Sequence, residues 1–276
     1  MNLTDIPCTA ASLGIDEAGL GAAGFMVSAM QPYTLRVAAV DQPMLIVPLR
    51  GQKHVIAEQG DVSVGIGQYL MLHRGFKGAV RNLTDDGLYQ AWCIVFPWHV
   101  IGLARTLLDA HTLPPAPGSA LGTGTLAPLG EALQRLVDAA KSGDDIVRDH
   151  ALLGLLLALA RGGESQFRLA QDPALATRIR LLVSSAPARG WSSPDVETQL
   201  HMSGATLRRR LAAEHTSLRV LVREARLDHG LYQLQTTRRP LKSVAHACGY
   251  RSVPSFCRQF AERFGVDAAT VANGGG

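Results

Sequence analysis

The feature that most constrains the fold is a pair of similar segments in the C-terminal third, residues 203–214 (SGATLRRRLAAE) and 252–264 (SVPSFCRQFAERF). Each segment opens on a serine, which suits a helix N-cap, and then carries apolar residues four positions apart on one helix face. The apolar pairs are Leu207 and Leu211 in the first segment and Phe256 and Phe260 in the second. A shorter helical stretch and a tight turn precede each segment. The chain therefore predicts two helix-turn-helix units.

The residues around these segments predict further helices. A first helix is expected to open at Asp172 as cap with Pro173 just inside, and Ser192 or Ser193 caps the next short helix. Residues 217–235 predict a long connecting helix of roughly 28 Å, at 1.5 Å per residue. This helix would hold the two segments, 203–214 and 252–264, about 30 Å apart. Helix-turn-helix units at that separation match successive major-groove entries on one face of DNA, since one turn is about 34 Å.

Charge is divided unevenly along the chain. Residues 171–276 hold 15 basic and 8 acidic side chains, whereas residues 1–170 hold 12 and 15. All but one of the C-terminal basic residues are arginines, which suit bidentate contacts to phosphate and guanine. The pattern favours a C-terminal part that meets double-stranded DNA. The alternative interpretation is a solvated charged surface.

The N-terminal half predicts a different architecture. Between residues 33 and 96, short runs rich in Val, Ile, Leu and Tyr alternate with Gly, Pro and Asp. Six or seven short strands at this spacing are typical of a small β-barrel or sandwich. Residues 1 to about 30 show only weak periodicity. The predicted fold class is α+β, with a cupin-like β-barrel first and an all-α domain after it.

Helical patterns follow the strands at 98–110, 126–141 and 144–161, and a Pro/Gly-rich connection is expected at 113–124. Asp144 and Asp145 start the third helix, where the helix dipole favours anions. Its leucines occupy nearly every side, and a helix that is apolar all round must be buried. We expect this helix, which ends at Arg161, to pack partly against a second subunit as a homodimer. The alternative is a central helix of one domain.

The barrel offers little sign of catalysis. Cupin barrels that bind metals use an HxH pair, and here His54 and His73 stand alone. We therefore predict no metal, no cofactor and no catalytic residue. The interior is expected either to hold a small effector or to be packed with side chains. The candidate lining residues cannot be oriented without the strand register; they are Arg36, Arg50, His54, Tyr69, His73 and Trp92.

Cysteine usage and the N-terminus predict a cytoplasmic protein. The cysteines form no CxxC motif, and Cys93, Cys248 and Cys257 are expected to be small core residues. No basic stretch followed by an apolar run marks a signal peptide. The most apolar run, residues 151–160, is too short to span a bilayer, so no membrane contact is expected.

A family resemblance rests on three ordered segments, at residues 203–218, 223–234 and 240–266. Together they resemble the DNA-binding region of AraC/XylS-type transcription regulators. The front half is similar, more loosely, to the effector and dimerisation domain of that family. The resemblance implies a sequence-specific regulator, most often an activator, with RNA polymerase as a partner. It assigns base-facing roles to six residues, which are Ala205, Arg208, Arg209, Val253, Pro254 and Arg258.

Two departures from the family pattern qualify these roles. Apolar Val253 and Pro254 replace polar base readers, so the second unit is expected to read thymine methyls or mostly to grip phosphate. The usual Pro-containing ending is absent after residue 266. The expected domains are an effector and dimerisation domain over 1–165, a DNA-binding domain over 171–266, and a disordered tail over 267–276, with a linker at 162–171.

Two rival interpretations stay open. One is a cupin-like oxygenase or isomerase with a DNA-binding tail, against which the missing HxH pair argues. The other is a regulator whose N-terminal domain responds only to a protein partner. The sequence does not choose between a small effector and a protein effector.

Overall fold

The structure is a computed structural model that describes residues 24–58, 60–73, 75–109, 119–168 and 174–273. It divides into two compact units, residues 1–170 and 171–276. Each unit is considered separately below.

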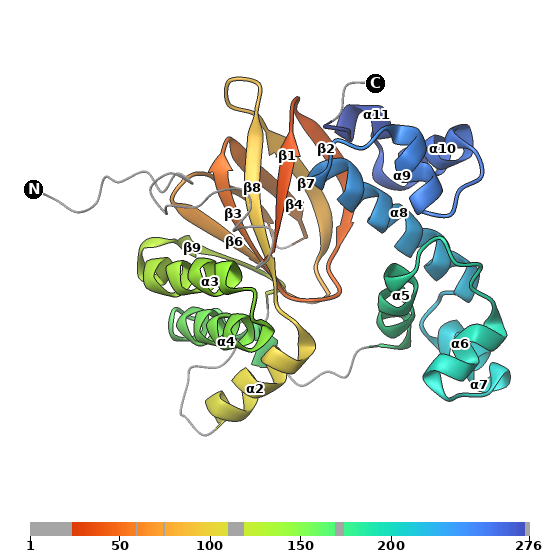
Figure 1. Ribbon diagram of the computed structural model, residues 1–276, viewed down its shortest axis with the longest axis horizontal. Coiled ribbons are helices and arrows are strands. Elements are labelled where there is room, and N and C mark those ends of the chain that lie inside the picture. Colours follow the sequence, from red (N-terminus) through yellow and green to blue (C-terminus); the bar gives the residue numbers. More distant parts are fainter. Residues whose placement is uncertain (1–23, 59, 74, 110–118, 169–173, 274–276) are drawn as a thin grey trace, which may run out of the picture. The chain divides into compact units, whose positions relative to one another are not determined.

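The first unit is built on two antiparallel sheets with strand orders β1-β8-β3-β6-β9 and β2-β7-β4-β5 (Figure 1). The strands are β1 Phe25–Ala29, β2 Tyr33–Ala39, β3 Met44–Arg50, β4 Gln52–Ala57, β5 Gly60–Val64, β6 Gln68–Leu72, β7 Lys77–Leu83, β8 Tyr89–Val95 and β9 Leu121–Thr125. The helices are α2 Trp98–Asp109, α3 Gly130–Ser142 and α4 Asp145–Arg161, with short 3-10 turns at Ala127–Leu129 and Gln166–Arg168.

Helices α2, α3 and α4 cover one face of the five-stranded sheet (Figure 1). Alternate residues of β8, such as Trp92 and Ile94, join Leu133 and Leu155 of the helices in one buried cluster. The intervening residues of β8 are buried on the opposite face, toward the four-stranded sheet. The α+β prediction is confirmed.

Two strands were not predicted. β1 lies in the stretch of weak periodicity, and β9 lies in the segment expected to be a connection. β9 reads LGTGT and pairs with β6, where Gly124 lies opposite Tyr69. A Cβ on Gly124 would lie 2.6 Å from the Tyr69 hydroxyl, and one on Gly122 would lie 2.0 Å from the Glu164 carboxylate. These glycines are needed for close packing, although their composition indicated a loop.

Part of the expected linker belongs to the first unit. Glu164, Ser165 and Phe167 are buried, and the His73 Nε2 atom lies 3.1 Å from Glu164 Oε2. Residues 169–173 lie outside the described part of the chain. The linker prediction is therefore wrong for residues 164–167, because a carboxylate with a buried imidazole partner and a phenylalanine that joins the core are held in place.

Helix α4 is covered by its own unit more fully than its sequence suggested. Leu152, Leu155, Leu156 and Leu159 lie in the core cluster formed with α2, α3 and the sheet. The exposed side runs through residues such as Val147, which is 44% exposed. The premise that one unit could not cover these leucines is wrong, and the exposed side alone is left for a partner.

The second unit is all helical, as expected. Its helices are α5 Leu175–Ser185, α6 Ser193–Leu200, α7 Gly204–Ala213, α8 Leu218–Thr236, α9 Leu241–Ala247, α10 Val253–Phe264 and α11 Ala268–Val271. Figure 1 shows α6 and α7 near one end of α8, and α9, α10 and α11 near its other end. The long connecting helix is therefore present, with Leu221 and Ala225 buried in its first half and Leu227 and Leu234 in its second.

Both ends of this unit differ from expectation. The predicted cap at Asp172 and Pro173 lies outside the described residues, and the first N–H groups of α5 instead donate to the Glu214 carboxylate, at 3.0 and 2.9 Å. The tail expected to be disordered contains α11, whose Ala268 and Val271 are each 1% exposed. That prediction is wrong for residues 267–273, because two small apolar side chains are buried there among the other helices.

Candidate nucleic-acid interface

Helix α6 begins at a capping box, and a left-handed residue with a close contact sets the turn from α6 to α7. The Ser192 hydroxyl accepts from the Asp195 N–H while the Asp195 carboxylate accepts from the Ser192 N–H, which makes a capping box. His201 then reverses the chain with φ 52°, in the left-handed region. A Cβ on Gly204 would lie 2.6 Å from a carboxylate oxygen of Glu197, so α7 begins in close contact with α6.

Helix α7 has one buried face, as predicted. The Ser203 hydroxyl accepts from the Thr206 N–H at 3.3 Å and caps the helix. Leu207 and Leu211 are 1% and 3% exposed. They contact the apolar core of this half of the unit, which contains Leu175, Ile179, Val183, Val196, Leu221 and Ala225.

The opposite face of α7 is open. Ala205, Arg208, Arg209 and Arg210 are all exposed. No ion pair or hydrogen bond engages these three guanidinium groups within the described part of the chain. Their charges are therefore available to an anionic partner, and the small side chain of Ala205 permits close approach near the start of the helix.

The second helix-turn-helix, formed by α9 and α10, repeats this geometry with different chemistry. Gly249, with φ 79°, turns the chain after α9, and the Ser252 hydroxyl accepts from the Ser255 N–H at 3.4 Å. The inward face of α10 is an aromatic column of Phe256, Phe260 and Phe264, with successive ring centroids 5.6 and 4.6 Å apart. These rings are at most 1% exposed, so they form the core of this half.

Only one arginine of α10 is free to meet a ligand. Arg258 and Pro254 are exposed and Val253 is half-buried. Arg263 is instead bound to α8, where its Nη2 atom lies 2.9 Å from Asp228 Oδ1 and its Nη1 atom 3.0 Å from Glu224 Oε1. The sequence reasoning singled out Arg258, and the structure explains why Arg263 cannot share its role.

The six candidate lining residues of the barrel do not converge. Tyr69 and Trp92 are buried on the sheet face that the helices cover, and His73 is paired with Glu164. Arg36 is exposed. The remaining two form surface pairs, Arg50 with Asp86 at 3.5 Å and His54 with Asp61 at 3.7 Å.

The sequence reasoning missed Lys53, which is 6% exposed and lies between the two sheets. Tyr33, Asn82 and Lys53 are register partners across β2, β7 and β4. The Lys53 ammonium donates to Asn82 Oδ1 at 2.9 Å, and the Asn82 amide donates to the Tyr33 hydroxyl at 2.9 Å. Burial lowers the pKa of Lys53. The alternation in β4 places Lys53 on one face with Val55 and His54 on the other with Ile56, and only the register shows which face is inward.

The Tyr89 ring lies across from this ladder, with its centroid 5.5 Å from Lys53 Nζ. Its hydroxyl is buried and has no hydrogen-bond partner among the described residues. Burial raises the pKa of Tyr89 well above its usual value. The space between the sheets therefore holds an ammonium group near a tyrosine ring whose hydroxyl is unsatisfied, with apolar residues around them.

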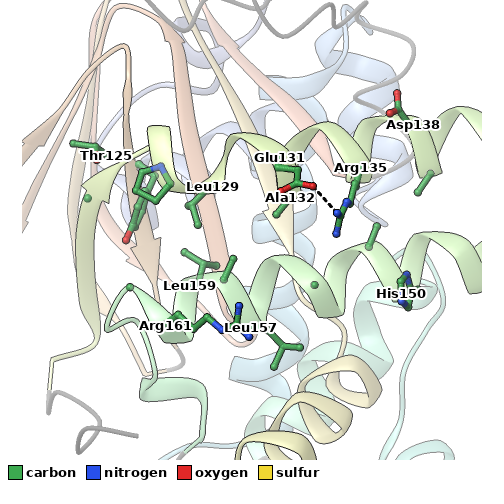
Figure 2. Close-up of a pocket in the computed structure, with 18 of the residues that line it drawn as sticks. Thr125, Leu129, Glu131, Ala132, Arg135, Asp138, His150, Leu157, Leu159 and Arg161 are labelled. Carbon is green, nitrogen blue, oxygen red and sulfur yellow. Dashed lines mark hydrogen bonds and ion pairs between the residues drawn. The ribbon is translucent and has the colours of Figure 1, made fainter. Parts of the chain in front are cut away.

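A groove of about 1080 Å³ lies along α3, α4 and β9 (Figure 2). Its lining mixes small apolar residues, such as Ala132 and Gly154, with charged ones. Figure 2 shows Glu131 paired with Arg135 on α3, facing His150 and Arg161 on α4. Small apolar residues between charged ones are a surface against which an amphipathic helix can pack.

The described residues give no sign of a metal centre. No group of three His, Cys, Asp or Glu side chains among them could hold an ion. Cys93 and Cys248 are buried free thiols, as predicted, whereas Cys257 is only partly buried. Burial raises the pKa of Cys93 and Cys248 to about 12, which disfavours their thiolate forms. No helix in the described ranges is both long and apolar enough to cross a bilayer.

The chain is similar to known proteins in two comparisons of sequence. Residues 197–273 match a family described as "Helix-turn-helix domain". The HTH-type transcriptional regulator GadX of Escherichia coli K12 is 28% identical over 125 residues, which are 44% of this chain and 46% of that protein. The urease operon transcriptional activator of Escherichia coli is 27% identical over 128 residues, 45% of this chain and 43% of that protein.

The whole fold is similar to ToxT from Vibrio cholerae strain SCE256. The unsaturated fatty acid-bound wild-type structure has a TM-score of 0.58 at 14% identity, and covers 89% of this chain and 92% of that one. At this identity the likeness concerns the fold alone. It confirms the two-domain architecture of a β-rich front and a helical back.

These matches confirm a helix-turn-helix domain at residues 197–273 and a resemblance to transcription regulators that carry one. The chain's alignments cover less than half the length of the curated relatives. What the whole protein does is therefore a matter of proposal.

Proposed function

We propose that this protein is a sequence-specific DNA-binding transcription regulator that places α7 and α10 in successive major grooves. The observation that carries the proposal is the pair of capped helices on α8, each with a buried apolar face and an exposed face that bears unpaired arginine. Two such helices on one connecting helix suit a ligand with a repeated anionic groove. Because its ligand is DNA, the protein would act in the cytoplasm.

In this proposal Ala205, Arg208 and Arg209 meet the bases and phosphates of the first groove. Arg258 acts in the second groove, where Val253 and Pro254 offer apolar contact to thymine methyls. Arg210 is exposed on the same helix as Arg208 and is an added candidate for a phosphate contact.

The test is selection of bound duplexes from a random DNA pool by the purified full chain, followed by titration at fixed salt. The double variant Arg209→Ala, Arg258→Ala is expected to lose binding, since it removes a base contact worth about 1–3 kcal/mol and a cation near the backbone. Lys77→Ala, an exposed cation of the first unit, is the matched control. Full binding by the double variant would contradict the assignment.

We also propose activation through RNA polymerase. Transcription with purified polymerase from a promoter that carries the selected duplex is expected to rise on addition of the protein. Repression in the same assay would assign the opposite sign while leaving the DNA-binding proposal intact.

We propose that the protein is a homodimer through the exposed side of α4. The supporting observation is a seam of Val147, Gly154 and Ala158, with buried Ala151 between them, which lines the groove. Small residues at this spacing let a second helix approach closely, and the charged rims can fix its direction. Val147→Asp is expected to give monomers in sedimentation experiments, whereas Ile66→Asp, on an exposed loop, is not. A dimer that survives Val147→Asp would contradict this surface.

We further propose that the first unit responds to a small carboxylate held between its sheets. Lys53 and the unsatisfied Tyr89 hydroxyl support this site, because a carboxylate could accept from both. An unsaturated fatty acid is the first compound to try, given the ligand of the similar ToxT structure. Binding should raise the melting temperature of the full chain, and Lys53→Met should abolish the rise. No rise with any carboxylate would favour a protein effector instead.

A further inference from the structure

Helix α8 connects the two helix-turn-helix units covalently, and a second connection lies beside it. The loop that joins α5 to α6, residues 186–192, packs against the turn between α9 and α10. A Cβ on Gly249 would lie 3.1 Å from both Pro187 O and the Ala188 Cα. The two loops therefore meet backbone to backbone, in a space where a methyl group would be tight.

One arginine of α8 bonds to the first loop at this contact. The Arg226 Nε atom donates to Pro187 O at 2.9 Å, and its Nη2 atom donates to Arg189 O at 2.9 Å. The Arg226 Cζ atom lies 3.2 Å from the position that a Gly249 Cβ would take. A planar guanidinium with two fixed donors suits this double contact, and a lysine could not reproduce it. Arg226, which belongs to the connecting helix, therefore contacts both the α5–α6 loop and the turn between α9 and α10.

The α5–α6 loop in turn contacts α6, the first helix of the first helix-turn-helix. The Trp191 indole N–H donates to Ala186 O at 2.9 Å, and the Arg189 guanidinium stacks 4.6 Å from the Trp191 ring centroid. Arg189 also pairs with Asp195, the acidic member of the α6 capping box, at 2.5 Å. A displacement of the second turn is thereby passed to α6, and through the tight turn to α7.

We infer that Arg226 is a positioning residue for two-site DNA reading, which fixes the orientation of α7 relative to α10 without touching DNA. A helix alone lets each unit tilt about its end. A tilt of ~10° at one end of a helix roughly 28 Å long displaces the other end by about 5 Å. That displacement exceeds the rise of one base pair, about 3.4 Å. This inference rests on the proposed function.

The test compares full and half sites on DNA selected by the wild-type full chain from a random pool. Half-site duplexes carry one of the two recognised segments, and two further duplexes have one base pair added or removed between them. Arg226→Lys and Arg226→Gln are expected to bind the full duplex at least about tenfold more weakly, with half-site binding changed by less than about twofold. Their preference for the original spacing should also flatten. Arg223→Gln, an exposed arginine one turn earlier on α8, is the control and should keep the spacing preference.

Gly249→Ala tests the same contact from its other side and leaves Arg226 intact. It is expected to show the same loss on full sites with half sites preserved. Equal losses on full and half sites in both Gly249→Ala and Arg226→Gln would overturn the inference, because a direct DNA contact or loss of fold acts on both. Full recovery by Arg226→Lys would also overturn it, since charge alone would then suffice. If the wild-type chain selects no sequence, the proposed function itself fails; in the other outcomes wild-type selection is intact.

Discussion

The two helix-turn-helix units have the same geometry and are held together by different interactions. The first packs an aliphatic core around Val196, Leu207 and Leu211, beside the capping box of α6. The second relies on three stacked phenylalanines and on Arg263, which two acidic residues of α8 bind. A helix-turn-helix therefore requires a fixed angle between two short helices and does not prescribe how that angle is stabilised.

The exposed faces differ as well. Helix α7 presents Arg208, Arg209 and Arg210, whereas α10 presents Arg258 beside apolar Val253 and Pro254. We expect the first helix-turn-helix to supply most of the sequence discrimination and the second to supply affinity through phosphate contacts. The following predictions test this difference, from the largest expected effect to the smallest.

The largest effect should come from the aromatic column. Phe260→Ala is expected to cost about 3–5 kcal/mol, because a fully buried ring leaves a cavity between two other rings. Hydrogen exchange of the full chain should show faster exchange in α9 and α10, with smaller changes in α6 and α7. Leu207→Ala, in the first helix-turn-helix, should give the opposite pattern. Equal acceleration in both units for both variants would show that they unfold as one body.

The reading faces should separate in their response to sequence and salt. Arg209→Ala is expected to cost about 1–3 kcal/mol on the selected duplex and to relax its sequence preference. Arg258→Ala should weaken binding to all sequences alike and reduce the salt slope by about 1. Titration of selected and scrambled duplexes over a salt series measures both. If Arg258→Ala changes preference more than Arg209→Ala, the proposed division of roles is reversed.

The caps should behave alike in the two units. Ser203→Ala and Ser252→Ala are each expected to lower stability by about 1 kcal/mol, since each hydroxyl accepts from a backbone N–H of its helix. Urea unfolding of the full chain, followed by helix content, measures the change. Ser185→Ala, which removes an exposed hydroxyl at the end of α5, is the control. A larger loss at one cap would show that the two turns differ in strain.

The smallest effect concerns acid. Hydrogen bonds from the Ser192 side chain and backbone, together with the Arg189 guanidinium, hold the pKa of Asp195 below its usual value. A depressed folded pKa contributes stability above the unfolded pKa, and that stability is lost as pH falls through the folded pKa. Asp195→Asn should therefore be less stable than wild type near neutral pH, with the difference vanishing in acid. A difference that persists below pH ~2 would assign the effect to packing instead of charge.

The sequence predicted the helices of residues 171–276 well because their signals are local. Ser203 and Ser252 cap helices as expected, since a cap needs only its own hydroxyl and an N–H two or three residues ahead. The buried pair Leu207 and Leu211 follows from the helical period. The strands from residue 33 to residue 95 were found in the same way, by alternation and turn residues.

What the sequence missed depends on residues far apart in the chain. β9 forms because β6 offers an edge, and its glycines make room for Tyr69 and Glu164. The capping of α5 by Glu214 joins residues 39 positions apart. Lys53 was passed over for its neighbour His54, because choosing the inward residue requires the register of β4 against β7.

The sequence by itself determined the number of helix-turn-helix segments, their caps, their inward faces and the arginines on their outer faces. Periodicity, capping and charge act within a few residues, so they can be read along the chain. Only the tertiary structure decided which arginines stay free. Arg263 is bound by α8 and Arg226 by a distant loop, while Arg209 and Arg258 face outward. An ion pair or a loop contact depends on which surfaces meet, and that is settled only when the helices pack.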